Sequence, residues 1–262
     1  MKRRTLDIAF SIGGAVFSVL LLVLGLVLSQ QKDFADTYVK DQMHEQAIFF
    51  KPVDKLATEE DFQKTLLEKL GTKEKVDAFI AEYKVTSEAN SKCLVKYAGL
   101  EVNTGKMAEC YANDFIRLHA LESSIVTGTG LEIKGADGKM VSADGVSYTY
   151  ASISPVQAAA KAAVQTLKDE KASDEDIAAA EKIVTGLAGT RSTLLTGQTL
   201  RGLLLTTYGF SIFGEKGGLA ATVCYIAFAL LLLLSLLGLL HAFFSKHAQD
   251  LVLPAVEHKT EA

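Results

Sequence analysis

Two long apolar blocks stand out from the mixed pattern of the rest of the chain. Residues 8–29 contain no charged side chain, and residues 219–244 contain no Asp, Glu, Lys or Arg, with His241 near their end. At about 1.5 Å per residue, each block is long enough to cross a hydrocarbon core of about 30 Å. The alternative for the first block, a cleaved signal peptide ending near Ser29, is disfavoured because such peptides have apolar cores of about 7–15 residues. We predict two transmembrane helices.

The basic residues beside these blocks predict the topology. Lys2, Arg3 and Arg4 precede the first block, and Lys246 follows the second. Because positive charge is retained on the cytoplasmic side, we expect cytoplasmic ends at 1–7 and 245–262, and an extracytoplasmic domain at 30–218 in the cell membrane. No Asp, Glu, Lys or Arg lies at mid-depth of either block, which disfavours a transporter or channel.

Small residues within the two blocks would allow the helices to pack closely. They recur at helical spacing, although such residues are also common in membrane helices without any packing role. They are Ser11, Ala15 and Ser18 in the first block and Gly238 and Ala242 in the second.

Between the blocks, helical periodicity and capping signals predict a mainly α domain. We expect the first helix to continue over 33–50 and to end at Pro52. Capping residues and glycines place the other boundaries. One expected helix runs from Thr58 to Gly71, and the next begins at Thr72. The others run from Thr86 or Ser87 to Gly99, from Thr104 to Glu122, from Ser154 to about Lys171, and from Ser173 to near Gly189.

Two segments depart from this pattern. Glycines interrupt 123–154, where residues 131–134 and 139–141 predict a small β-hairpin. Residues 190–213 are apolar but contain Arg201, whose insertion costs about 2.5–3.5 kcal/mol. We expect an amphipathic helix that lies on the outer membrane surface or on the domain, followed by a joint at 214–218.

Charge and composition exclude several functions. The 262-residue chain has a formal net charge of −4, and residues 30–218 hold 22 basic and 27 acidic side chains, so a nucleic-acid partner is not expected. Three cysteines and five histidines show no zinc-binding spacing, and nucleotide-loop and nucleophile-elbow motifs are missing. We predict no cofactor and no bound metal.

Two cysteines are candidates for a disulfide bond. Cys93 and Cys110 both lie in the domain expected outside the cell, where thiols tend to be oxidised, whereas Cys224 falls in the second apolar block. If residues 87–98 and 104–122 form an antiparallel helical hairpin, Cys93 and Cys110 lie level with one another. The alternative is that each is a small buried residue, because helix axes are usually about 8–10 Å apart.

Three groups of residues together form a recognisable pattern. They are Val39, Asp41, Gln42 and 46–49; 97–99, Val102, Gly105, Ala108, 111–116 and His119; and 198–205 with 208–210. These groups, which cover roughly a quarter of the chain, resemble an actinobacterial family of two-pass membrane proteins with a helical extracytoplasmic domain. The sequence departs from the family at Phe50-Lys51-Pro52, where a Phe-Pro pair is expected, and between Glu122 and Tyr148, where its hairpin is longer.

The resemblance implies the two-pass plan, and some members of the family carry the label aromatic ring-opening dioxygenase. That chemistry uses non-haem iron, held by two histidines and a carboxylate. The domain offers only His44 and His119, on different predicted helices, with Glu45, Asp114 and Glu122 nearby in sequence.

The sequence favours a non-catalytic accessory or scaffold protein of a membrane complex or cell-envelope process. Its expected partners are the lipid bilayer and another membrane or envelope protein, or a second copy of the chain. The alternatives are a ligand-binding sensor subunit, which would need a separate output partner, and the iron enzyme. Candidate contact residues for a partner or ligand are Asp114, Arg117, His119, Arg201 and Tyr208. Arg201 would pair with a domain carboxylate, bind a lipid phosphate or an acidic ligand, or extend to the headgroups.

Overall fold

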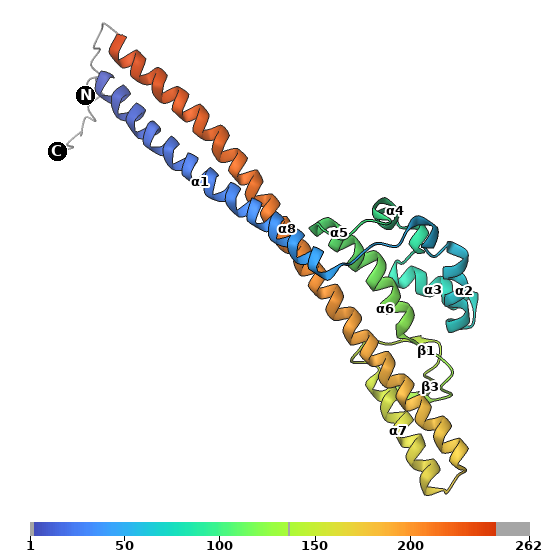
Figure 1. Cartoon of the computed structure of the whole chain (residues 1–262). Coiled ribbons are helices and arrows are strands. Elements are labelled where there is room, and N and C mark those ends of the chain that lie inside the picture. Colours follow the sequence, from blue (N-terminus) through green and yellow to red (C-terminus); the bar gives the residue numbers. More distant parts are fainter. Residues whose placement is uncertain (1–2, 136, 245–262) are drawn as a thin grey trace, which may run out of the picture. The chain divides into compact units, whose positions relative to one another are not determined.

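The computed structural model describes residues 3–135 and 137–244, which are mainly helical (Figure 1). The helices are α1 (Arg3–Gln46), α2 (Glu59–Leu70), α3 (Lys73–Tyr83), α4 (Lys92–Tyr97), α5 (Gly105–Cys110), α6 (Arg117–Ser124), α7 (Ser154–Asp169) and α8 (Asp174–Phe244), with 3-10 turns η1 (Val53–Lys55) and η2 (Glu88–Asn90) and a π-helical segment η3 (Tyr111–Ile116). Four short strands are β1 (Ile125–Val126), β2 (Glu132–Lys134), β3 (Met140–Ser142) and β4 (Val146–Ser147). The described residues up to Thr37 and from Ile212 onward form one compact unit, the helix-pair unit, and Tyr38–Ser211 forms the other, the domain unit.

In the helix-pair unit, α1 packs against the C-terminal part of α8 through small side chains. A Cβ on Gly14 would lie 2.5 Å from the Ser235 hydroxyl, and one on Gly238 would clash with the Ser11 hydroxyl. Ser18 and Ala242 are also buried. Four of the five predicted small residues, Ser11, Ser18, Gly238 and Ala242, are therefore buried or closely packed in the helix pair.

Helices α1 and α8 each contain a stretch that is long and apolar enough to cross a membrane. Their outward-facing leucine, valine and phenylalanine side chains are largely exposed, Phe10 and Phe244 among the most. Polar contacts supplement the packing: the hydroxyls of Ser29 and Tyr225 are 3.0 Å apart, and His241 Nδ1 lies 3.2 Å from Asp7.

Three groups of buried apolar side chains form the core of the domain unit. One joins the end of α1 to α4, α5 and α8 and includes Met43, Phe50 and Leu204. The second joins α7 to α8 and the β1–β4 region, and the third joins α2 and α3 to α6. Because Leu194 and Leu204 are almost fully buried here, the 190–211 part of α8 packs on the domain, which was one of the two predicted placements.

The capping predictions for three helices are confirmed. The Thr58 hydroxyl accepts from the Asp61 amide, and the Asp61 carboxylate accepts from the Thr58 amide, so α2 has a complete capping box closed by Gly71 in the left-handed conformation. The Thr72 hydroxyl caps α3 by accepting from the Lys75 amide, and Ser173 caps α8 by accepting from the Asp176 amide. These interactions are local, which is why the sequence reveals them.

Other predicted boundaries are wrong. Helix α1 ends at Gln46 rather than near Phe50, because the Phe50 amide donates to Leu100 O and the Val102 amide donates to Ile48 O, which draws this segment into an isolated β-bridge. The single short helix expected before Gly99 is divided into η2 and α4. Helix α7 is present as predicted and ends at Asp169, close to Lys171, but its N-cap is Ile153 instead of Ser154.

The largest correction concerns α8. A helix ending near Gly189, an amphipathic helix at 190–213 and a joint at 214–218 were expected, but one uninterrupted helix covers all three. Each glycine costs only about 1 kcal/mol in a helix. A Cβ at Gly214 would meet Ala35, and one at Gly218 would meet Lys32, so these positions serve close helix contact instead of a break.

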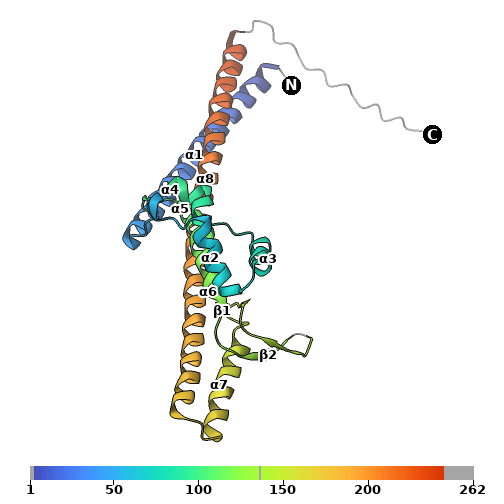
Figure 2. The same cartoon turned by 90° about the vertical axis from the view of Figure 1, so that its right-hand side faces the viewer.

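The predicted hairpin is confirmed as β2 and β3, with Ile133 opposite Val141. A second antiparallel pair, β1 and β4, was not predicted and flanks it in sequence. Figure 2 shows β2 extending away from the helices of the domain unit. The Asp144 carboxylate accepts from the Thr129 and Gly130 amides and so joins the β3–β4 connection to the β1–β2 connection.

Candidate functional site

The candidate residues gather around the π-helical segment η3 between α5 and α6. Here the Arg117 amide donates to Ala112 O, five residues earlier, so the helix contains one extra residue in its turn. Such segments are rare and are frequent at functional sites. Three of the five candidate contact residues, Asp114, Arg117 and His119, lie on or directly after η3.

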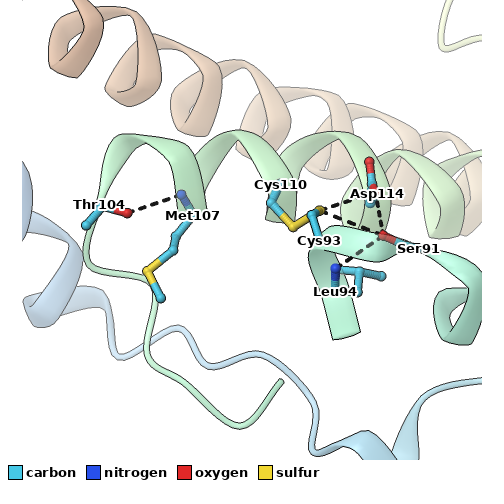
Figure 3. The surroundings of a disulfide bond; sticks show 7 residues. All are labelled: Ser91, Cys93, Leu94, Thr104, Met107, Cys110 and Asp114. Atoms are coloured by element: carbon cyan, nitrogen blue, oxygen red, sulfur yellow. Dashed lines mark hydrogen bonds between the residues drawn. A yellow bond between two sulfur atoms is a disulfide. The ribbon is translucent and has the colours of Figure 1, made fainter. Parts of the chain in front are cut away.

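At one end of η3, a disulfide bond joins α4 to α5. The Cα atoms of Cys93 and Cys110 are 6.0 Å apart, within the range that a disulfide requires. Figure 3 shows Asp114 beside this bond. The Asp114 carboxylate accepts from the Ser91 hydroxyl at 2.5 Å, and that hydroxyl in turn accepts from the Leu94 amide at the start of α4. The predicted pairing of Cys93 and Cys110 thus has the geometry of a bond.

A buried carboxylate lies on the other side of η3, and sequence analysis missed it. The Glu88 side chain has 0% exposure and accepts from Lys51 Nζ at 2.8 and 3.0 Å and from the Ala57 amide at 2.9 Å. Burial alone would raise the pKa of Glu88, but these hydrogen bonds and one from His119 outweigh it and lower the pKa. Glu88 is therefore an ionised, fully partnered anion.

His119 connects this anion to α6. Its Nε2 lies 2.7 Å from Glu88 Oε1, and its Nδ1 lies 3.1 Å from Glu122 Oε2. The hydrogen bond to Glu122 and, after the opposing effect of burial, that to Glu88 raise the pKa of His119. Each ring nitrogen thus has a carboxylate oxygen within hydrogen-bond distance. Both nitrogens are therefore already engaged within the domain unit.

Aromatic rings cover this charged cluster. The Phe115 ring contacts the His119 ring edge to face, with centroids 4.5 Å apart, and Lys51 Nζ lies 5.1 Å from the Phe115 centroid. Burial, with the nearby charge of Glu88, raises the pKa of Tyr111. Lys51 thus provides a cation to both the Glu88 carboxylate and the Phe115 ring.

A pocket of about 350 Å³ opens beside His119, between α6 and α8. Hydroxyl groups provide most of its polar lining. Its residues are Ile116, His119, Ala120, Ser123, Ser192, Thr193, Thr196 and Gly197. A second pocket of about 340 Å³ adjoins the disulfide and includes Lys106, Glu109 and Asn113.

Arg201 faces η3 from α8. Its Nη2 donates to Asn113 Oδ1 at 3.0 Å, and its buried Nε has no partner among residues 3–135 and 137–244. Arg117 donates to the Tyr83 carbonyl at the end of α3. The structure thus brings Arg201 to the same helix as Asp114, Arg117 and His119. Tyr208 lies elsewhere, where its backbone packs closely against Gly105.

The predicted ingredients of an iron site are not brought together by these contacts. His44 is 76% exposed and lies 2.9 Å from Glu101, in contrast to His119 with its two carboxylates. In the described part of the chain, no group of three or more His, Cys, Asp or Glu side chains is arranged to hold a metal ion.

The chain matches no family model, no curated protein and no solved structure. The resemblance to the actinobacterial two-pass family therefore stays a prediction.

Proposed function

We propose that this protein is a non-catalytic accessory subunit of a membrane complex or cell-envelope process, anchored by α1 and α8. The observation that carries the proposal is the state of the titratable groups at the candidate site. Glu88 and His119 are already engaged with each other and with Lys51 and Glu122, and Asp114 is engaged by Ser91. General acid–base catalysis requires a group within reach of a substrate proton, whereas these groups hold the domain together.

The proposed topology places both ends in the cytoplasm and the domain unit outside. Two independent features support it. Basic residues flank both apolar blocks on their outer ends in the sequence. The Cys93–Cys110 geometry favours an oxidising compartment for the domain unit, because disulfides rarely persist in the cytosol.

A reporter that is active only outside the cytoplasm tests this topology. It should be active when inserted near Gly138, in the exposed β2–β3 turn, and inactive when fused after Ala262. Activity at both positions would place Gly138 and Ala262 on the same side of the membrane and contradict the single crossing proposed between them.

The accessory role is tested by purification in mild detergent, followed by identification of copurifying proteins and metals. A stoichiometric membrane or envelope partner, lost when the domain surface is mutated, is the expected result. Bound iron in place of a partner would contradict the proposal and favour the dioxygenase alternative.

A sensor subunit is the second candidate function, and the course of α8 favours it. The pocket beside His119 is lined by Ser192 and Thr196 of the same uninterrupted helix that continues to Phe244. A ligand that displaces this stretch of α8 would act directly on a helix that also contributes to the apolar pair. Polar small molecules that raise the melting temperature of the wild type, but not of a Gly197→Leu variant, would support it.

A further inference from the structure

Two arginines of the domain unit lie close together without a carboxylate. Arg201 donates to Asn113 Oδ1, and Arg117 follows Asn113 by about one turn on the same helix. Neither guanidinium forms an ion pair within the described residues. Burial, followed by the charge of Arg117, lowers the pKa of Arg201, as expected for two neighbouring cations.

The acidic groups around η3 do not neutralise this pair. The Asp114 carboxylate accepts from Ser91, Glu88 accepts from Lys51 and His119, and Glu122 contacts His119. Half-buried like charges are unfavourable unless a counter-charge is bound. A bound anion from outside the domain unit would therefore reduce the repulsion between the two guanidiniums.

The pair also has unused hydrogen-bond donors. The Nε of Arg201 is buried and unpartnered in the described part of the chain. The Asn113 oxygen accepts from Arg201, so its amide nitrogen is a donor, and Arg117 uses one donor on the Tyr83 carbonyl. Arg201 and Asn113 thus present donors beside the positive charge of Arg117.

We propose that Arg117, Arg201 and Asn113 form a binding site for a phosphate group. The planar guanidinium fork matches the oxygens of phosphate or carboxylate. A carboxylate offers only two oxygens and one negative charge, whereas a phosphate group offers more oxygens to donors that approach from two helices and can carry up to two charges. The phosphate belongs either to a small soluble compound or to a phospholipid headgroup. This site goes beyond the accessory role and does not depend on it.

Binding is measured on the full chain in a phosphate-free detergent. Inorganic phosphate is titrated against chloride at constant ionic strength, with calorimetry as the readout. Separately, native mass spectrometry records retention of phosphatidylglycerol against a diacylglycerol with the same acyl chains. The variants are Arg117→Gln, Arg201→Gln and Arg201→Lys. Arg191→Gln is the matched control, because Arg191 is also on α8 and also has an unpartnered buried Nε, but contacts Gln157 and the Tyr150 ring.

We expect the wild type and Arg191→Gln to bind one phosphate source, and both glutamine variants to lose about tenfold or more in affinity, as for loss of a charged hydrogen bond. Arg201→Lys should also weaken binding, because it keeps the charge and loses the fork.

Binding of inorganic phosphate identifies a soluble ligand, and retention of phosphatidylglycerol alone identifies a headgroup. Failure of the wild type to bind either source overturns the site, as does equal binding by Arg201→Gln and Arg191→Gln. A copurifying protein lost in Arg201→Gln, without binding of either phosphate source, would assign the arginines to a partner's carboxylate instead. The wild-type titrations decide the question even if a variant fails to fold.

Discussion

Removal of the Cys93–Cys110 bond should destabilise the domain unit by a magnitude that follows from its position in the chain. The two residues are separated by 17 positions, and restriction of the unfolded chain by a loop of this length is worth about 3 kcal/mol. The double variant Cys93→Ala, Cys110→Ala introduces no new polar group beside the buried Leu94 and Asp114. For a protein of this size, about 3 kcal/mol corresponds to a decrease in melting temperature of roughly 6–12 °C.

Thermal unfolding of the full chain in mild detergent measures this decrease. Cys224→Ala is the control, because Cys224 is a free thiol in the apolar part of α8. Reductant should destabilise the wild type to a similar extent and leave the double variant unchanged. Mass spectrometry of alkylated, unreduced protein should find only Cys224 modified. Alkylation of Cys93 and Cys110 without reduction, or equal melting temperatures of the double variant and Cys224→Ala, would refute the reasoning.

Two further predictions concern charge and helix packing. Because the pKa of Glu88 is lowered from its usual 4.5, Glu88 stabilises the fold above pH 4.5, and this stability is lost as the pH falls through the folded-state pKa. Because the pKa of His119 is raised from its usual 6.5, His119 stabilises the fold below pH 6.5, and this stability is lost as the pH rises through the folded-state pKa. Melting temperatures should therefore be highest at mildly acidic pH, and His119→Gln should abolish the alkaline decrease; an unchanged alkaline limb would contradict this. In the helix pair, Gly25→Ala places a Cβ 2.8 Å from the Tyr225 ring and should cost about 1–3 kcal/mol, whereas Gly13→Ala meets nothing within 4 Å; equal melting temperatures of the two variants would disprove the close packing.

Features that depend on neighbouring residues could be predicted from the sequence. The capping box of Thr58 and Asp61, the glycine that closes α2, and the β2–β3 hairpin all involve contacts within a few residues. The level positions of Cys93 and Cys110 follow from the length of the turn between two short helices. In each case the sequence spacing nearly determines the distance in space.

Features that depend on tertiary contacts could not. Glu88 resembles a surface residue in the sequence, and its burial requires Lys51, the Ala57 amide and His119, which are up to 37 positions away. The breaks expected in α8 at its glycines did not occur, because a small intrinsic penalty is outweighed by packing. The π-helical turn also has no recognisable signal in the residues that form it.

That turn has a consequence for how the helix from Gly105 to Ser124 tolerates change. A π-helical turn contains one residue more than an α-helical turn, and each residue of an α-helix advances the side-chain direction by about 100°. Deletion of one residue within Tyr111–Ile116 would restore ordinary helical winding and rotate Arg117 and His119 away from Arg201 and Glu88, while Cys110 kept its direction towards Cys93. The extra residue therefore fixes the direction of Arg117 and His119 relative to that of Cys110, so the length of this segment is itself a structural constraint.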